Sequence, residues 1–252
     1  MFSIDERNRV RDRVLERARA DGRIVAGAVV GSLAHAEGDR WSDLDLTFGV
    51  TDGVPIKDVL DDFTADLSTV FAAIDLFDVQ AGAATYRVFL LPGCLQLDLS
   101  CAPASQFRAL GPEFRLLFGE PAAPAHAQPP PVRQLFGYAV HHAVRARFCI
   151  ERGRYWQAEY WTSGVRDYAL SLACQRRHLP VHHGRGFDLL PQDVRQPAES
   201  ALPRGIEPAE LLRALGCAVD LLLRESEEVE PLAKRAAPEL RQLTRAKGDL
   251  AD

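Results

Sequence analysis

The sequence predicts a mixed α/β fold for its first half and an all-helical second half, and three observations support this prediction. Short apolar runs typical of strands alternate with helical patterns over residues 1–118. Apolar residues recur at helical spacing over residues 132–252. Between these parts, residues 119–131 contain five prolines and no apolar period, as a linker does. We therefore expect two domains, 1–118 and 132–252, joined by the linker 119–131.

The first domain is expected to contain a mixed β-sheet flanked by helices. Helices are predicted at residues 3–20 and 55–70, and strands at residues 24–30, 43–50, 74–80, 85–91 and 94–101. In the second of these strands, Leu44 and Leu46 alternate with Asp43 and Asp45. Because successive side chains of a strand point to opposite faces, the two aspartates are expected to share one face.

The second domain is expected to be a bundle of four or five helices. Helices are predicted at residues 132–152, 155–177, 191–202, 207–226 and 230–247. Leu211, Leu215, Val219 and Leu222 recur at helical spacing, which is the usual sign of a stripe that faces a core.

The composition excludes several classes of protein. The chain of 252 residues is 47% hydrophobic and 26% charged, within the ordinary range of globular domains, and has no apolar run long enough to cross a membrane. The first residues are charged and lack the pattern of a signal peptide, so a cytoplasmic location is expected. The five cysteines never form a CxxC pair, so we expect small buried side chains rather than disulfides or a structural zinc site.

The charge differs between the two halves. Residues 1–120 carry 12 Lys and Arg against 19 Asp and Glu, a net charge of −7, whereas residues 121–252 carry 18 against 16, a net charge of +2. An acidic surface is unsuited to tracking a phosphate backbone, which normally requires clustered basic residues. An anionic ligand of the first domain is therefore expected to be bound through metal ions or backbone amides.

One motif indicates a site for phosphate and cations. It consists of Gly31 and Ser32, ten further residues, and then Asp43 and Asp45. A Gly-Ser that follows a buried strand and opens a helix offers unpaired backbone N–H groups and a hydroxyl to phosphate oxygens. Two aspartates on one strand face can share divalent cations.

A third carboxylate is expected from Asp98. It alternates with Leu97 and Leu99, so it faces away from the core. Three adjacent carboxylates repel one another, and two Mg²⁺ ions would relieve this repulsion. The alternative to a metal site is that Gly31-Ser32 is an ordinary helix cap and Asp43 a turn residue. This alternative leaves Asp45 and Asp98 as unpaired acids within apolar strands, which costs free energy.

The pattern resembles the active site of the DNA polymerase β nucleotidyltransferase superfamily. A small catalytic domain followed by a helical domain is similar to the antibiotic nucleotidyltransferases that adenylylate aminoglycosides or lincosamides. The resemblance implies that Gly31 and Ser32 hold the triphosphate, that Asp43 and Asp45 ligate both Mg²⁺ ions, and that Asp98 ligates the catalytic ion and helps to deprotonate the acceptor hydroxyl. It implies transfer of a nucleoside monophosphate, with AMP from ATP as the expected group, to a small-molecule hydroxyl in a cleft between the domains, with release of pyrophosphate.

Further candidates come from outside the motif. In the resembling enzymes a carboxylate of the helical domain often acts as general base, and Glu159 is the candidate here, because it shares a polar helix stripe with Ser163 and Arg166. The alternative is an intrahelical Glu–Arg pair beside an aromatic core. Arg40 and Arg185 are candidate contacts to nucleotide phosphates; a solvated arginine and a plain loop residue are the alternatives.

The sequence is compatible with more than one acceptor and with other functions. The acceptor could be an aminoglycoside, a lincosamide or another metabolite, and antibiotic resistance is one version of the function. Alternatives are a toxin-like nucleotidyltransferase that acts on RNA or protein, and a non-catalytic regulatory module that binds nucleotide. No extended nucleic acid and no membrane is expected as a partner, whereas a homodimer is common among the enzymes that the chain resembles.

Overall fold

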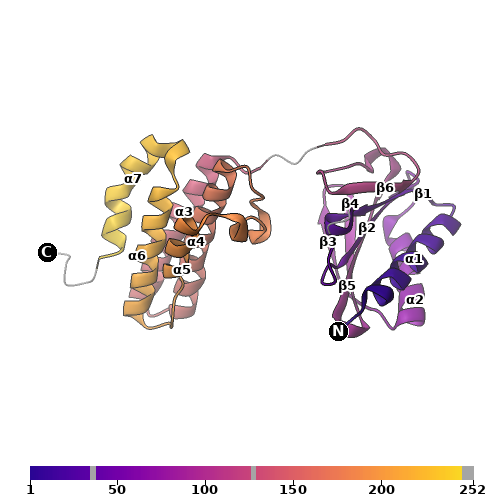
Figure 1. The fold of residues 1–252 in the computed structure, drawn as a ribbon, viewed down its shortest axis with the longest axis horizontal. Helices are drawn as coiled ribbons and strands as arrows, with labels where there is room; N and C mark the ends of the chain where they lie inside the picture. The colour runs from indigo at the N-terminus through magenta and orange to yellow at the C-terminus, as the bar shows by residue number, and fades with distance from the viewer. Residues whose placement is uncertain (35–37, 126–128, 246–252) are drawn as a thin grey trace. The chain divides into compact units, whose positions relative to one another are not determined.

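The computed structural model describes residues 1–34, 38–125 and 129–245. The chain divides into two compact units, Met1–Ala127 and Gln128–Asp252 (Figure 1). The predicted mixed α/β class with a helical later part is confirmed. Residues 126–128 of the predicted linker, and residues 246 and 247 of the last predicted helix, lie outside the described residues. Among the described helices, none is both long and apolar enough to cross a membrane.

The described part of the first unit forms a six-stranded sheet and two α-helices. The helices are α1 (Ile4–Ala20) and α2 (Ile56–Phe71), and the strands are β1 (Ile24–Val30), β2 (Leu44–Val50), β3 (Ile74–Ala81), β4 (Ala84–Leu91), β5 (Leu95–Pro103) and β6 (Phe114–Phe118). The strands lie in the order β3-β4-β5-β2-β1-β6. Strands β2 and β5 run parallel, and the other neighbouring pairs run antiparallel.

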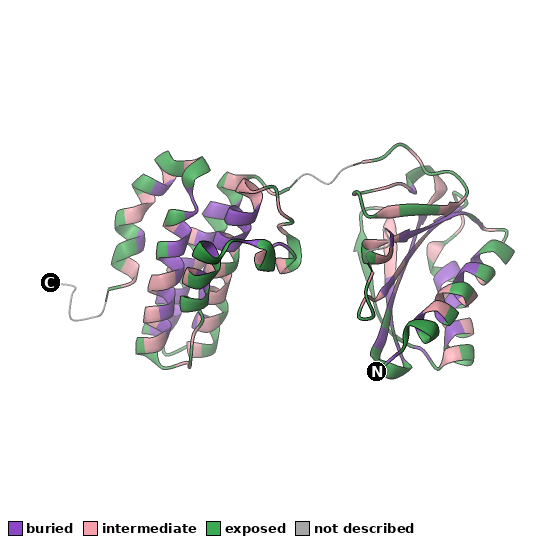
Figure 2. Cartoon of the chain, in the orientation of Figure 1, coloured by how far each residue is buried: buried purple, intermediate pink, exposed green. Residues whose placement is uncertain are grey.

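The core of the first unit lies between the sheet and the two helices, which cover the same face (Figures 1 and 2). Leu44, Leu46 and Phe48 of β2 are fully buried there together with residues of α1 and α2. On the opposite face, a small cluster that includes Ala26, Ala28 and Phe107 covers part of β1. The alternation predicted for β2 is therefore confirmed, and it assigns Asp45 to the face opposite to α1 and α2.

Helix α1 begins at a capping box. The Ser3 hydroxyl accepts a hydrogen bond from the Glu6 backbone N–H (3.2 Å), and the Glu6 carboxylate accepts one from the Ser3 N–H (2.6 Å). These two bonds satisfy donors that would otherwise be unpaired at the start of the helix. Val10 and Val14 lie on the buried side.

The strand β6 was not predicted. It has five residues and pairs antiparallel with β1 at the end of the sheet. All five of its side chains are partly or fully exposed, so the apolar alternation that marks the inner strands is missing from Phe114–Phe118. The short helical stretch predicted at Gly31-Ser32 is present as the 3₁₀ segment Gly31–Ala34.

The described residues of the second unit, 129–245, form five α-helices, within the predicted four or five. They are α3 (Val132–Glu151), α4 (Tyr155–Arg176), α5 (Gln192–Ser200), α6 (Pro208–Arg224) and α7 (Glu230–Leu243). Their buried sides face one another (Figure 2), and the core includes Leu211, Leu215, Val219 and Leu222 of the predicted stripe. Two short 3₁₀ segments, His182–Gly184 and Phe187–Leu189, connect α4 with α5.

A buried carboxylate joins two helix ends of the second unit. The side chain of Glu225, which follows α6, is only 2% exposed and accepts hydrogen bonds from Arg176 (2.6 Å), Arg177 (3.3 Å) and Arg224 (3.1 Å). Three guanidinium groups compensate the cost of burying this charge and fix the end of α6 against the end of α4.

Arg87 holds α2 on the sheet of the first unit. Its guanidinium, 8% exposed, donates two hydrogen bonds to Asp78 of β3 (2.7 and 2.8 Å) and one each to Asp61 and Thr64 of α2 (both 2.9 Å). The hydrogen bonds from Arg87 lower the pKa of Asp78 below its ordinary value.

We expect Arg87→Met to lower the free energy of unfolding of the protein by roughly 1–3 kcal/mol at pH 7, because several charge-assisted hydrogen bonds are lost. A lowered carboxyl pKa stabilises the fold above the ordinary pKa of aspartate, about 3.9, and this stabilisation is lost as the pH falls through the folded-state pKa. The difference between the two proteins should therefore shrink towards pH 3, as measured by urea unfolding.

The matched control is Arg9→Met, which removes an exposed arginine of α1. Equal effects of the two substitutions at pH 7, or a difference that does not depend on pH, would contradict this role of Arg87.

Candidate active site

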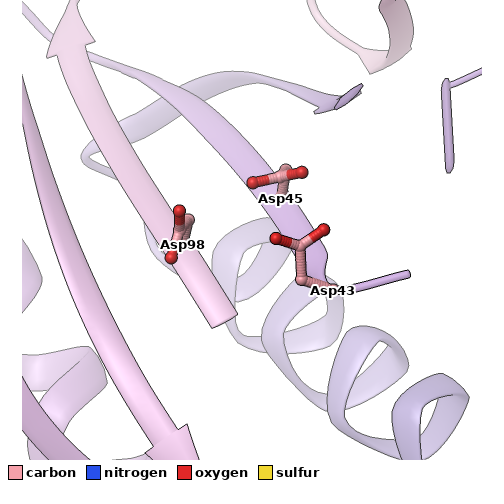
Figure 3. Close-up of side chains that lie close together, drawn as sticks. All are labelled: Asp43, Asp45 and Asp98. Carbon is pink, nitrogen blue, oxygen red and sulfur yellow. The ribbon is translucent and has the colours of Figure 1, made fainter. Parts of the chain in front are cut away.

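Three aspartates converge on the face of the sheet that is opposite to α1 and α2. Asp43, Asp45 and Asp98 each place a carboxylate oxygen within 4.8 Å of the other two, and all three are partly buried. Asp45 and Asp98 are direct partners in the parallel pairing of β2 with β5, whereas Asp43 immediately precedes β2. Figure 3 shows the three carboxylates turned towards a common space, with helices behind the sheet. We call this group the Asp triad.

The donor set of the Asp triad suits a hard divalent cation. Mg²⁺ prefers oxygen ligands, and the three side chains offer oxygens alone. Two carboxylates at this separation repel one another by roughly 1–4 kcal/mol, depending on the effective dielectric constant. A cation among them would turn this repulsion into attraction, so the residues present fit the metal ions that the motif implies.

Gln96 orients the carboxylate of Asp98. It lies two residues earlier on the same face of β5 and donates a hydrogen bond from Nε2 to Asp98 Oδ1 (2.9 Å). Burial raises the pKa of Asp98 above its ordinary value and the charge of Asp43 raises it further, whereas the hydrogen bond from Gln96 acts in the opposite direction. The nearby Tyr86 also has a raised pKa, first because of burial and then because of the charge of Asp45.

Gly31 makes room for the Asp triad. Its φ is +68°, and a Cβ at this position would lie 2.4 Å from Asp45 Oδ2. A side chain at position 31 would therefore be strained and would displace a carboxylate of the triad. The Gly-Ser pair of the motif thus lies directly against the predicted metal site.

The prediction that Gly31 offers an unpaired N–H to phosphate is wrong. The Gly31 N–H donates to the Glu113 carbonyl (3.2 Å), because the segment before β6 lies beside it. The segment that Gly31 opens has only four residues, so it has no long helix dipole behind it. Ser32 is exposed and remains a candidate phosphate contact.

Two arginines that sequence reasoning missed hold the segments around the site. Arg115 of β6 donates to the carbonyls of Ala34 (3.1 Å) and Leu33 (3.5 Å), the end of the Gly31–Ala34 segment. Arg7 of α1, 4% exposed, donates to the carbonyls of two residues that precede Asp43. The sequence signal for Arg7 is a charged residue at helical spacing from the buried Val10 and Val14.

The Arg7 contacts shape the turn that leads into Asp43. Arg7 Nη1 donates to the carbonyls of Asp39 and Ser42, each at 2.7 Å. Within the turn, the Asp39 carboxylate accepts from the Trp41 N–H (2.8 Å) and the Ser42 hydroxyl accepts from the Asp39 N–H (3.0 Å). Both ends of residues 39–42 are thereby fixed to α1, which positions the backbone from which Asp43 projects.

Arg40 belongs to this turn, and its side chain is exposed. The guanidinium carbon lies 4.3 Å from the centre of the Trp41 ring, a cation–π contact. In the sequence, Arg40 lies three residues before Asp43. Its contact with a nucleotide phosphate stays a prediction.

The candidates from the later half of the chain lie in the second unit. The Glu159 carboxylate in α4 accepts a hydrogen bond from the Ser163 hydroxyl (2.7 Å). The alternative of a Glu159–Arg166 pair is wrong, since Arg166 instead donates two hydrogen bonds to Asp167 (2.9 and 2.8 Å). Arg185 is exposed and follows the His182–Gly184 segment. The roles of Glu159 and Arg185 at the Asp triad stay predictions, because the triad belongs to the first unit.

Comparisons with known proteins find similarity to solved structures but not to sequences. No protein-family model matches the chain, and no curated protein matches its sequence. The solved structure of an aminoglycoside 6-adenyltransferase from Bacillus subtilis is similar to this chain, with 12% identity over 93% of this chain and 97% of that chain and a TM-score of 0.38. This similarity is too low to assign the chain to the family of that enzyme. The fold and the site define an α/β protein with a helical second unit and a carboxylate site suited to cations.

We expect Gly31→Ala to weaken binding of Mg²⁺ or Mn²⁺ at least 10-fold, because the new methyl group must displace the Asp45 carboxylate. Alanine at a positive φ also costs about 1–2 kcal/mol in stability. The matched control is Gly82→Ala, which shares a positive φ (+63°) but meets no atom within 4 Å. Mn²⁺ titration followed by electron paramagnetic resonance measures the affinity. Equal affinities of the two variants would contradict the role assigned to Gly31.

Proposed function

We propose that this protein is a divalent-metal-dependent nucleotidyltransferase, which transfers a nucleoside monophosphate to a hydroxyl of a small molecule. The expected group is AMP from ATP, and pyrophosphate is the second product. The observation that carries the proposal is the convergence of Asp43, Asp45 and Asp98 within 4.8 Å, on the face of the sheet opposite to α1 and α2. The approach of Gly31 to Asp45 supports it, since both parts of the predicted motif meet at one place.

In this proposal the Asp triad holds two Mg²⁺ ions, and Gly31 and Ser32 adjoin the triphosphate. Arg40 and Arg185 are proposed as further contacts to its phosphates. Bound Mg²⁺ would neutralise charge on the attacking oxygen of the acceptor hydroxyl and on the leaving oxygen of pyrophosphate. Because the three carboxylates repel one another, the triad is unfavourable without a cation, and a bound cation would offset this cost.

The transfer forms one bond and breaks one. The acceptor hydroxyl oxygen attacks the α-phosphorus and forms a new P–O bond, while the bond from the α-phosphorus to the bridging oxygen of pyrophosphate breaks. Pyrophosphate leaves with the electron pair, and the hydroxyl proton passes to a carboxylate base, for which Asp98 and Glu159 are the candidates. The hydrogen bond from Gln96 to Asp98 fixes the orientation of one of these two carboxylates.

The charge of the first unit supports a small acceptor over a nucleic acid. Residues 1–120 carry a net charge of −7, and an acidic surface disfavours a long phosphate backbone. The acceptors to test first are aminoglycosides and lincosamides, the two classes that the motif's resemblance implies.

We expect Asp43→Asn and Asp98→Asn each to lower the transfer of label from [α-³²P]ATP by at least about 100-fold, because each removes a charged ligand of the cations that would stabilise the transition state. The assay incubates the protein with Mg²⁺, each labelled nucleoside triphosphate and a panel of aminoglycosides, lincosamides and RNA. Removal of the metal with EDTA should abolish transfer, and added Mg²⁺ should restore it.

The matched control is Asp75→Asn. Asp75 is paired in register with the buried Phe89 and so faces the helices instead of the Asp triad. Transfer that survives both triad substitutions, or that proceeds equally in EDTA, would overturn the proposed function.

If Glu159 is the general base, Glu159→Gln should lower kcat by about 100- to 10,000-fold, because a positioned base contributes about this much. The KM for ATP should stay within about 2-fold, since Glu159 is proposed to act on the acceptor. Glu199→Gln, at an exposed position of α5, is the matched control. A Glu159→Gln variant that transfers at the normal rate would leave Asp98 as the base.

A further inference from the structure

The face of the sheet that carries the Asp triad continues as an apolar surface over β3 and β4. The pairing of these strands fixes which side chains share that face, since partners in an antiparallel pair point the same way. Val88 pairs with Asp98, and Phe77 pairs with Val88. The residues of β3 and β4 on this face are Ile74, Phe77, Val79, Tyr86, Val88 and Leu90. We call these six residues the apolar platform.

Four of the six residues of the apolar platform are exposed, whereas Tyr86 is partly buried and Val88 is only 8% exposed. Ile74 is 58% exposed, Phe77 55%, Val79 45% and Leu90 37%. Every residue of β3 is exposed, and Figure 2 shows this strand in the colour of exposed residues. Single exposed apolar side chains are common, but a contiguous group on two neighbouring strands is typical of a binding surface.

No charged side chain belongs to the apolar platform. The charged residues of β3 and β4 are Asp75, Asp78 and Arg87, and all three lie on the helical face. Arg87 and Asp78 are joined there to Asp61 of α2. The apolar platform therefore suits an uncharged ligand and offers no partner to a polycation.

The apolar platform, the Asp triad and Gly31 follow one another across the strands of the sheet. Phe77, Val88, Asp98 and Asp45 form one row across four neighbouring strands. Neighbouring strands are about 4.8 Å apart, so Phe77 lies roughly 10 Å from Asp98 along this row. Gly31 adjoins Asp45, at the opposite end of the row from Phe77.

This arrangement has a chemical consequence under the proposed function. In phosphoryl transfer the attacking and leaving oxygens lie roughly in line on opposite sides of the phosphorus. If the leaving pyrophosphate lies towards Gly31 and Ser32, the acceptor approaches from the side of Asp98. The acceptor then lies over the apolar platform.

We propose that the apolar platform binds the acceptor, and that the acceptor is a hydroxyl-bearing molecule with an uncharged apolar portion rather than a polycation. The proposal rests on the proposed function and names the substrate class of that site. The hydroxyl reaches the Asp triad while the apolar portion covers Phe77 and Val79. The reacting bonds are those of the transfer described above, and no further reactant is needed.

The first experiment measures binding and does not depend on transfer. The probes are n-octyl β-D-glucoside, below its micelle concentration, and methyl β-D-glucoside, which differ in the length of the alkyl chain alone. Ligand-observed NMR titrations use the wild type, Phe77→Ser, Val79→Ser and Leu116→Ser. Leu116 is the matched control, because it is 39% exposed on β6, at the opposite end of the sheet from β3. Circular dichroism verifies that each variant is folded.

We expect the wild type to bind the octyl glucoside at least 5-fold more tightly than the methyl glucoside, because the longer chain buries apolar surface. Phe77→Ser and Val79→Ser should each remove most of this preference, and Leu116→Ser should retain it. The preference should survive in Asp98→Asn, which separates this result from the test of transfer. No preference in the wild type, or an equal preference in Phe77→Ser, would overturn the proposal.

A second experiment uses any acceptor found by the transfer assay. Phe77→Ser should raise the KM for that acceptor about 10-fold and leave the KM for ATP within about 2-fold. A polycationic acceptor whose KM is unchanged by Phe77→Ser would overturn the role of the apolar platform in binding the acceptor, but it would leave the proposed function intact. Sedimentation that shows a wild-type dimer dissociated by Phe77→Ser would also overturn it, since a second copy would then occupy this face.

Discussion

The parallel pairing of β2 with β5 is the constraint on which the candidate site depends. It aligns Asp45 with Asp98 across two neighbouring strands, and the alternation of both strands turns these side chains away from the core. A shift of one residue in this register would move one carboxylate to the helical face, where leucines fill the space. The buried leucines of β2 and β5 therefore determine the separation of the carboxylates as much as the aspartates do.

Backbone contacts complete this arrangement from outside the two strands. Arg7 fixes the turn before Asp43, and Arg115 fixes the end of the segment that begins at Gly31. Both arginines donate to carbonyl oxygens, so their effect on the site does not require any particular side chain in the segments that they hold. Each one joins a distant element, α1 or β6, to the immediate surroundings of the Asp triad. The geometry of the site is thus a property of the whole first unit.

Much of the site could be predicted from the sequence, because its signals are local. The alternation of Asp45 with Leu44 and Leu46, and of Asp98 with its neighbouring leucines, gives the face of each side chain directly. Helical spacing places Arg7 on the buried side of its helix, but the partners of Arg7 and Arg115 could not be predicted, since side-chain bonds to carbonyls 32 and 81 residues away leave no local pattern. It also missed β6, whose exposed side chains follow no apolar period. The paired N–H of Gly31 depends on that missed part of the chain.

The position of β3 at the end of the sheet has a further consequence, which concerns its backbone. An outermost strand has one row of N–H and C=O groups without a strand partner, and such a row is a template for a strand of another chain. In β3 this row lies beside Ile74 and Phe77, which would favour aggregation. The strand also carries Asp75 and Asp78, and antiparallel pairing of two copies would bring acidic side chains of both copies together. These acids therefore disfavour pairing between two copies of the strand, so its apolar side chains can be exposed to water without promoting aggregation.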